Sequence, residues 1–224
     1  MNVLNVLFVG NSYTFFNDLP EFFGKLCTAN GKEVKTFSVT RGGRRLIQSL
    51  EGDEAALELE SLLKETSMDV CFLQEQSTLP IVDYPQFEAG VRGLSEKYQD
   101  RIQKFVLYMT WGRKEGAEFL TERGLTNETM TVALANAYKK AANAVGAELS
   151  PVGLGFKAAA DREPRLELHD PDKSHPSPLG SCLAALVHYV TLFRELPAVI
   201  PMELPPREKE TLTQTAALFL TEKE

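Results

Sequence analysis

Short apolar stretches alternate along the chain with longer segments in which apolar residues recur every three to four positions. Residues 3–9 form an almost unbroken apolar run, as expected of a strand that is buried on both faces. The longer segments have the spacing of amphipathic helices, which turn one apolar stripe toward a core. Strands that alternate with helices in this way are typical of a doubly wound α/β fold with a parallel sheet.

The pattern predicts five strands and seven main helices, separated by turns rich in Gly, Pro and Asn. The predicted strands are residues 3–9, 33–39, 69–73, 104–110 and 148–152. The predicted helices are residues 19–29, 44–50, 54–65, 87–98, 127–145, 178–194 and 207–222. Residues 113–126 form a mixed insertion with room for a helix, and residues 153–177 are polar and loop-like. No repeat or linker divides the chain, so we expect a single domain over residues 1–224.

Composition narrows the class of partner. The 224 residues are 43% hydrophobic, which is enough to build the core of one α/β domain. The net charge is −7 and no run of Lys or Arg exceeds two residues, which argues against nucleic acid because phosphate binding relies on clustered cations. Three cysteines without paired spacing predict reduced core thiols. With no signal-peptide pattern and no apolar segment of membrane-spanning length, we expect a cytoplasmic protein without a membrane partner.

Polar residues follow the predicted strands, where ligands bind in a doubly wound sheet. The segments are Gly10-Asn11-Ser12, Arg41-Gly42-Gly43, Gln74-Glu75-Gln76-Ser77 and Thr110-Trp111-Gly112, and Asp172-Lys173-Ser174-His175-Pro176 precedes the helix predicted at 178–194. They contain a serine as a candidate nucleophile, a histidine as a base and an aspartate to orient it. Glycine and glutamine could supply hydrogen-bond donors. These residue types together indicate acyl transfer.

Each of these residues also has a simpler interpretation. Ser12 could cap the helix that follows the first strand, which is a common use of serine. His175 and Asp172 could be solvated loop residues, and Gly42-Gly43 could be only a turn. If all the simple interpretations were true, these residues would occur in the order and at the strand ends of a hydrolase site by coincidence. We therefore favour the functional interpretation.

Four spaced blocks of the chain resemble the SGNH (GDSL-type) hydrolases, in the branch whose first block reads Gly-Asn-Ser-x-Thr. The matching blocks are "VGNSYT", "RGGRRL" and "DKSHPSPLGSCLAA". The third block differs, because the family usually has Gly-x-Asn where this chain has "LQEQS". The resemblance implies a three-layer α/β/α fold around a flavodoxin-like, five-stranded parallel sheet. It also implies a serine esterase or deacetylase that cleaves a small acyl or acetyl ester, such as an acylated sugar, without a cofactor.

The resemblance implies a role for each matched residue. Ser12 would attack the acyl carbon, His175 would carry the proton, and Asp172 would hold the imidazole in the correct tautomer. The backbone N–H groups of Ser12 and Gly43 would form the oxyanion hole with a glutamine side chain. We favour Gln76 because it is nearer the carboxyl end of the strand, with Gln74 as the alternative.

Other residues near these blocks have weaker assignments. Tyr13 and Trp111 are candidates for the wall of the substrate pocket, and Glu75 has no role in this scheme. His188 lies among apolar residues in "AALVHYV" and is predicted to be a core histidine.

Two other classes of function stay open from the sequence. The turn at residues 10–14 could bind an anion in a non-catalytic module, although no nucleotide-binding motif is present. The segment 169–175 holds His169, Asp170, Asp172 and His175, which could form the metal site of a metal-assisted hydrolase. Its irregular spacing argues against that arrangement, so we expect no metal.

Overall fold

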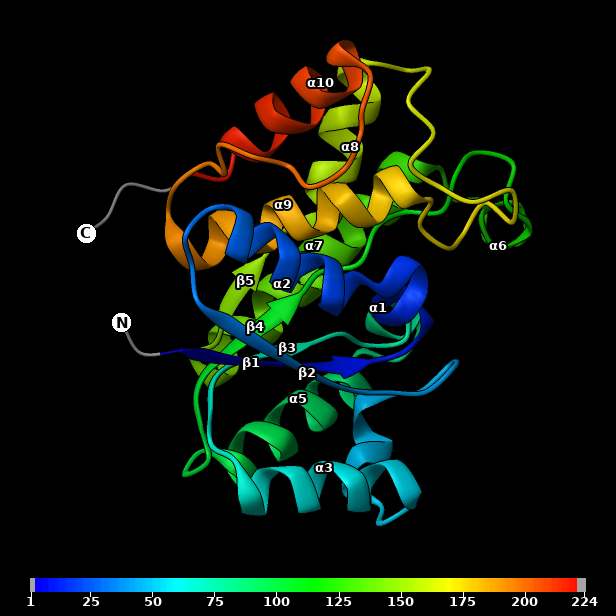
Figure 1. Cartoon of the computed structure of the whole chain (residues 1–224). Helices are drawn as coiled ribbons and strands as arrows, with labels where there is room; N and C mark the ends of the chain where they lie inside the picture. The colour runs from blue at the N-terminus through cyan, green and yellow to red at the C-terminus, as the bar shows by residue number, and fades with distance from the viewer. Residues whose placement is uncertain (1–2, 221–224) are drawn as a thin grey trace.

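The computed structural model describes residues 3–220 and has a parallel sheet of five strands at its centre (Figure 1). The strands are β1 (Leu4–Gly10), β2 (Val34–Thr40), β3 (Met68–Leu73), β4 (Ile102–Tyr108) and β5 (Glu148–Ser150). Their order is β2-β1-β3-β4-β5, and every neighbouring pair is parallel. This is the flavodoxin-like order, and it confirms the predicted fold class.

Strand β1 lies inside the sheet, between β2 and β3, and its side chains are apolar on both faces. Val6 lies opposite Thr36 of β2 and Val70 of β3. Val6 and Phe8 join the core on one face, whereas Leu7 and Val9 join the core on the other. An unbroken apolar run is what a strand covered on both sides requires.

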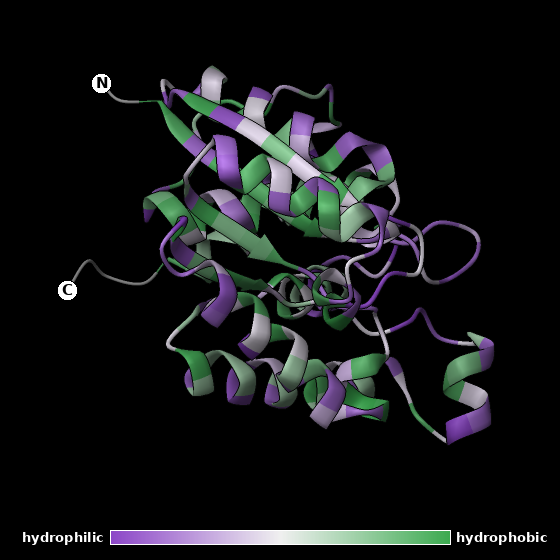
Figure 2. Ribbon diagram, turned by 90° about the horizontal axis from the view of Figure 1, so that it is seen from below, coloured by the Kyte–Doolittle hydropathy of each residue, from purple (hydrophilic) through white to green (hydrophobic). Residues whose placement is uncertain are grey.

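Helices cover both faces of the sheet. One layer contains α2 (Leu19–Ala29), α8 (Val152–Arg162), α9 (Pro178–Phe193) and α10 (Pro206–Ala217), and the other contains α3 (Glu54–Glu65), α5 (Tyr84–Tyr98) and α7 (Asn127–Val145). Figure 1 shows α2, α9 and α10 on one side of the sheet and α3 and α5 on the other. In Figure 2 the largely hydrophobic strands lie between helices of mixed hydropathy. The predicted three-layer arrangement is therefore confirmed.

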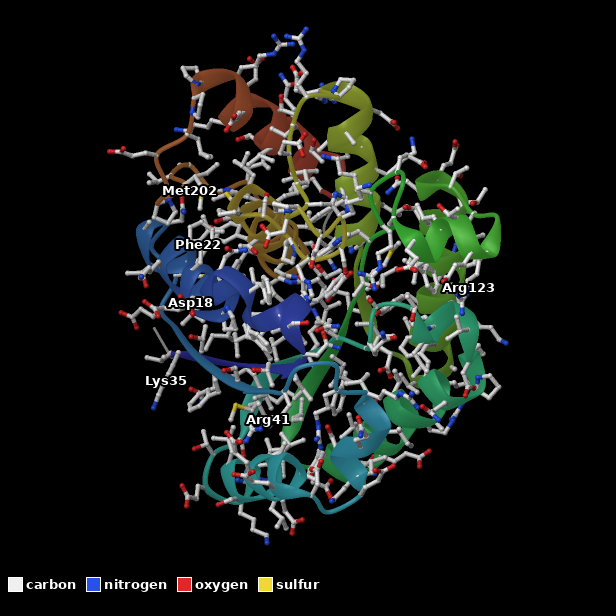
Figure 3. All side chains as sticks on the ribbon, turned by 90° about the vertical axis from the view of Figure 1, so that its right-hand side faces the viewer. Asp18, Phe22, Lys35, Arg41, Arg123 and Met202 are labelled. Atoms are coloured by element: carbon white, nitrogen blue, oxygen red, sulfur yellow. The ribbon has the colours of Figure 1, made fainter. Side chains whose placement is uncertain are left out.

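Several short elements gather where the strands end. They are α1 (Ser12–Phe15), α4 (Leu79–Val82), α6 (Glu118–Arg123) and the 3₁₀ turns η1 (Phe16–Asp18) and η2 (Leu46–Leu50). Figure 3 looks onto this end of the molecule, with Asp18 and Arg41 on one side and Arg123 of α6 on the other. The chain leaves β1 toward β2 and leaves β3 toward β4, so the connections diverge between β1 and β3. Such a divergence opens a crevice for a ligand.

Four predicted elements need correction. The tract 153–177 is not all loop, because α8 covers Val152–Arg162 and buries Phe156 and Ala159 in the core. Two glycines in the first turn of α8 lower its intrinsic helix propensity, and tertiary packing outweighs that preference. Of the helix predicted at residues 44–50, only Leu46–Leu50 is helical, as the 3₁₀ turn η2, and β5 ends at Ser150 instead of residue 152. The last predicted helix ends at Ala217, and residues 221–222 of that prediction lie outside the described residues.

Candidate active site

Asn11 shapes the turn that follows β1. Its backbone is extended, its side-chain Oδ1 accepts the Tyr13 N–H at 3.1 Å, and its Nδ2 donates to the Arg44 carbonyl at 2.9 Å. Asn11 is therefore the N-cap of α1, and the interpretation of Ser12 as that cap is wrong. The Ser12 hydroxyl is left available for another partner.

Gly10 is required where β1 passes the side chain of Gln74. A Cβ added at Gly10 would lie 2.6 Å from both Gln74 Oε1 and Thr14 Oγ1, too close for any larger residue. Gln74 Oε1 accepts the Asn11 N–H at 2.9 Å and the Thr14 hydroxyl at 2.8 Å. Gln74 is 1% exposed, and its side chain fixes the turn that carries Ser12.

A chain of hydrogen bonds joins the three residues predicted to carry the chemistry. Ser12 Oγ lies 2.8 Å from His175 Nε2, and His175 Nδ1 lies 2.5 Å from Asp172 Oδ2. The other oxygen of Asp172 accepts the N–H groups of Ser174 and His175, each at 2.9 Å. Burial raises the pKa of Asp172, but these hydrogen bonds outweigh burial and leave the pKa below its usual value. The carboxylate is thus ionised and holds the imidazole with Nε2 toward Ser12.

The loop that carries Asp172 and His175 is anchored from several sides. Lys173 adopts a left-handed backbone with φ 63°, which turns the chain tightly between the two residues. Trp111 Nε1 donates to the Ser174 carbonyl at 3.1 Å, and Tyr13 Oη lies 2.8 Å from Ser174 Oγ. The ring of Phe16 stacks on His175 with 4.3 Å between centroids. These contacts fix the imidazole against α1.

A pocket of about 230 Å³ opens beside Ser12 and His175. It is lined by Asn11, Ser12, Tyr13, Gly43, Gln76, Ser77, Arg113, Ser174 and His175. Tyr13, a candidate for the wall, is among the residues that line the pocket. Trp111 does not line the pocket, because it is fully buried and stacks on Tyr13 and Phe156 beneath it. The role of Trp111 is to support the wall.

Three residues that line this pocket have hydrogen-bond donors without partners among the described residues. Within residues 3–220, the backbone N–H groups of Ser12 and Gly43 donate to no other group. Gly43 has φ +65°, a left-handed conformation that favours glycine. Gln76 Oε1 accepts the Thr78 N–H and the Leu79 N–H, each at 2.9 Å, which fixes the orientation of its amide and leaves the NH₂ group free. The arrangement can bind a developing oxyanion.

Gln74 and Gln76 occupy different environments in the structure, and the sequence pattern did not predict this difference. Strand β3 ends at Leu73, so Gln74 and Gln76 are not alternate residues of one strand. The Gln74 amide is buried and donates to the Glu75 carbonyl, whereas Gln76 lines the pocket. Of the two glutamines, Gln76 is the one whose residue lines the pocket.

Glu75 links the two loops that carry the free donors. Its side chain is fully buried, and it accepts the Gln76 N–H at 2.6 Å and the Leu46 N–H at 3.2 Å. Leu46 follows the turn that contains Gly43, so one carboxyl group holds both loops. Burial raises the pKa of Glu75 to about 8, although the two backbone hydrogen bonds and the charge of Arg45 lower it.

This pKa predicts a pH-dependent stability. A carboxyl whose usual pKa is 4.5 and whose pKa in the folded protein is about 8 binds its proton more tightly in the folded state. The free energy of unfolding must therefore fall as pH rises between these values, by at most about 1.4 kcal/mol per pH unit. Glu75→Gln keeps an oxygen for both N–H groups and should remove this contribution. Urea unfolding at pH 5 to 8 measures the difference from the wild type.

Glu65→Gln is the matched control, because Glu65 is exposed at the end of α3 and has no ion pair in residues 3–220. Its unfolding should keep the wild-type dependence on pH. If Glu75→Gln keeps that dependence too, the buried carboxyl does not titrate in this range.

The segment predicted as an alternative metal site has a different arrangement. His169 Nε2 lies 3.0 Å from the Gly112 carbonyl and donates to it, and burial lowers the pKa of this imidazole. Asp172 and His175 bond to each other. In the part of the chain that the structure describes, no three His, Cys, Asp or Glu side chains converge as a metal ion would require. These residues do not support a metal-assisted mechanism.

Two further predictions concern buried residues. His188 is fully buried among the rings of Phe8, Phe72 and Tyr108, and its Nδ1 lies 2.7 Å from Ser150 Oγ. It is the core histidine that the sequence predicts, and burial lowers its pKa to about 3. All three cysteines are buried and free.

No helix within residues 3–220 is long and apolar enough to cross a membrane.

Comparison with known proteins identifies the class. No family model matches the sequence, and no curated protein matches it. Among solved structures, a protein of Slackia heliotrinireducens that is provisionally assigned as an SGNH hydrolase is 32% identical, with a TM-score of 0.74 over 85% of this chain and 100% of that chain. The fold and this relative together define the class as a hydrolase built on a parallel sheet. The chain belongs to the SGNH hydrolase family.

More distant structures share the fold. A DUF4886 family protein of Bacteroides uniformis is 22% identical, with a TM-score of 0.80 over 96% of this chain and 93% of that chain. A variant of Axe2, an acetyl xylan esterase of Geobacillus stearothermophilus, is 14% identical, with a TM-score of 0.63 over 86% of this chain and 97% of that chain. At these identities the likeness shows the shared fold.

Proposed function

We propose that this protein is a serine esterase that removes a short acyl group, most simply acetyl, from an alcohol. The observation that carries the proposal is the hydrogen-bond chain from Ser12 Oγ through the His175 imidazole to the Asp172 carboxylate, beside a pocket with unpaired donors. A nucleophile, a base and an orienting group in hydrogen-bond reach are the parts that acyl transfer needs.

In the acylation step, Ser12 Oγ attacks the acyl carbon while His175 Nε2 takes its proton. The carbonyl oxygen becomes negative and is bound by the backbone N–H groups of Ser12 and Gly43 and by the Gln76 amide. Asp172 stabilises the imidazolium that forms. His175 then gives the proton to the alcohol oxygen, the bond between the acyl carbon and that oxygen breaks, and the acyl group stays on Ser12.

Deacylation repeats these steps with water. His175 takes a proton from a water molecule, whose oxygen attacks the acyl carbon, and the same donors hold the second oxyanion. When this tetrahedral intermediate collapses, the bond between the acyl carbon and Ser12 Oγ breaks. Ser12 Oγ then recovers its proton from His175. The products are a carboxylic acid and the free serine, so the cycle needs no cofactor.

Two observations support a small acyl group on a sugar-like alcohol. The pocket of about 230 Å³ has room for a short acyl chain and part of an alcohol. The Geobacillus neighbours with the same fold are acetyl xylan esterases, which makes acetylated sugars the first substrates to test.

A non-catalytic anion site at residues 10–14 has less support. The Tyr13 N–H is bonded to the Asn11 side chain and the Thr14 N–H to the Asn11 carbonyl, so α1 offers an anion only the Ser12 N–H.

The proposed function is tested by hydrolysis of 4-nitrophenyl acetate and of acetylated xylose. The wild-type protein should release acetate from both, and dialysis against a chelator should leave the rate unchanged. A folded protein that releases no acetate would contradict the proposal. A rate that falls with the chelator and returns with Zn²⁺ would favour the metal-assisted alternative.

Gln76→Ala should lower kcat by about 10²–10³, with KM changed by less than about threefold. An oxyanion donor acts in the transition state more than in the bound ester, so its loss appears in kcat. Steady-state kinetics with 4-nitrophenyl acetate measure the two constants. Gln76→Glu is the second variant, because it keeps the oxygen that bonds Thr78 and Leu79 but removes the NH₂ donor. Its kcat should fall by at least as much as that of Gln76→Ala.

Gln74→Ala is the matched control. It should lower the melting temperature, because it removes buried hydrogen bonds to the Ser12 turn. If Gln74→Ala loses kcat without losing stability while both Gln76 variants stay active, the amide donor is Gln74.

A further inference from the structure

Arg113 brings a fixed positive charge to the candidate active site. It lies in the loop after β4 and lines the same pocket as Ser12 and His175. An arginine side chain stays charged at all ordinary pH values, and no other residue that lines this pocket carries a permanent charge.

The guanidinium is held in place without being neutralised. Its Nη2 donates to Ser77 Oγ at 2.9 Å, and its central carbon lies 5.6 Å from the centre of the Tyr13 ring. A cation over an aromatic face is a favourable contact that keeps the charge. Its Nε is buried and has no hydrogen-bond acceptor in residues 3–220.

Arg44 shows how this chain neutralises a buried arginine. Both of its terminal nitrogens bond the Asp53 carboxylate, at 2.5 and 2.7 Å. Arg113 has no carboxylate within 4.0 Å among the described residues, although the chain has 31 acidic residues for 24 basic ones. A half-buried arginine with free N–H groups in a pocket is the usual arrangement for binding a carboxylate from outside the protein.

We propose that Arg113 selects esters whose alcohol part carries a carboxylate. This inference rests on the proposed function, because the charge matters only if an ester is cleaved at Ser12. The proposed acyl group is acetyl, which has no carboxylate of its own, so the negative group must belong to the alcohol. Acetylated hydroxy acids and acetylated acidic sugars are the class of substrate that fits. Arg113 determines specificity and takes no part in bond making.

The test compares matched charged and neutral esters. 4-Acetoxybenzoate and 3-acetoxybenzoate carry the carboxylate, and the corresponding acetoxybenzamides are neutral analogues of the same shape. The wild-type protein should prefer a benzoate over its amide by about tenfold or more in kcat/KM. Arg113→Gln should reduce that preference by about 10–100-fold, because a charge-assisted hydrogen bond is lost, so kcat/KM should fall much more for the benzoates than for the amides. Arg113→Lys should keep part of the preference.

The outcomes separate this inference from the proposed function. Equal losses on benzoates and amides would show that Arg113 acts on every ester, and an unchanged preference would show that it binds no carboxylate. Either result overturns the inference and leaves the esterase assignment intact. If the folded wild-type protein cleaves none of these esters nor 4-nitrophenyl acetate, the proposed function itself fails.

Discussion

Ser12→Ala should lower kcat for 4-nitrophenyl acetate by about 10⁵–10⁶, which is the scale of losing the nucleophile of a serine hydrolase. Without the hydroxyl no acyl-enzyme can form, and only the oxyanion donors remain to assist attack by water. The side chain of Ser12 bonds only His175 within residues 3–220, so the melting temperature should stay close to that of the wild type. Kinetics and thermal unfolding on the same preparation measure both effects.

Ser174→Ala is the control for a lost hydroxyl in the same pocket. The Ser174 hydroxyl bonds Tyr13 instead of His175, so its loss should cost less than about tenfold in kcat. Comparable losses in the two variants would mean that Ser12 is not the nucleophile.

Asp172→Asn should lower kcat by about 10²–10⁴. The amide has no negative charge to stabilise the imidazolium, and its NH₂ group favours the tautomer that turns a proton toward Ser12. KM should change little, because Asp172 lies behind His175 and does not line the pocket. Steady-state kinetics between pH 6 and 9 measure the loss.

Asp170→Asn removes the same charge from the same loop. The Asp170 carboxylate makes no hydrogen bond within the described residues, whereas its backbone N–H donates to the His175 carbonyl at 2.8 Å and is unaffected by the substitution. Activity should stay within about threefold of the wild type. Equal damage from the two variants would show that loop charge, not the bond to His175, explains the effect of Asp172→Asn.

The sequence predicts the sheet and most helices because these elements depend on local periodicity. The boundaries of α2, α3 and α7 match the predicted ranges 19–29, 54–65 and 127–145. Helix α8 was missed because its glycines and polar flanks hide an apolar face that only packing against the core reveals. Boundaries of β5 and η2 depend on neighbours that are distant in sequence.

The residues of the candidate site were recognisable because each follows a strand or precedes a helix. Their spacing predicts which strand ends they occupy, but not which side chains meet. The choice between Gln74 and Gln76 depends on where β3 stops, and the cap of α1 depends on which of Asn11 and Ser12 turns inward. Both are decided by contacts between segments more than 30 residues apart.

Arg113 gave no signal in the sequence. It lies in an insertion without clear periodicity, and its importance comes from contacts with Ser77 and Tyr13, which belong to two other strand ends. Glu75 was visible but unexplained, because its partners are backbone N–H groups that a sequence does not display. Sequence patterns report which residues are polar, and only the fold shows which charges lack a partner.

Covalent labelling tests the central claim most directly. A fluorophosphonate reacts with an activated serine by forming a bond between Oγ and phosphorus, with fluoride as the leaving group, and peptide mass spectrometry locates the adduct. We expect one adduct per chain, on the peptide that contains Ser12, and none on Ser12→Ala. Labelling of another residue, or equal labelling of the two proteins, would contradict the assignment of Ser12 as the nucleophile.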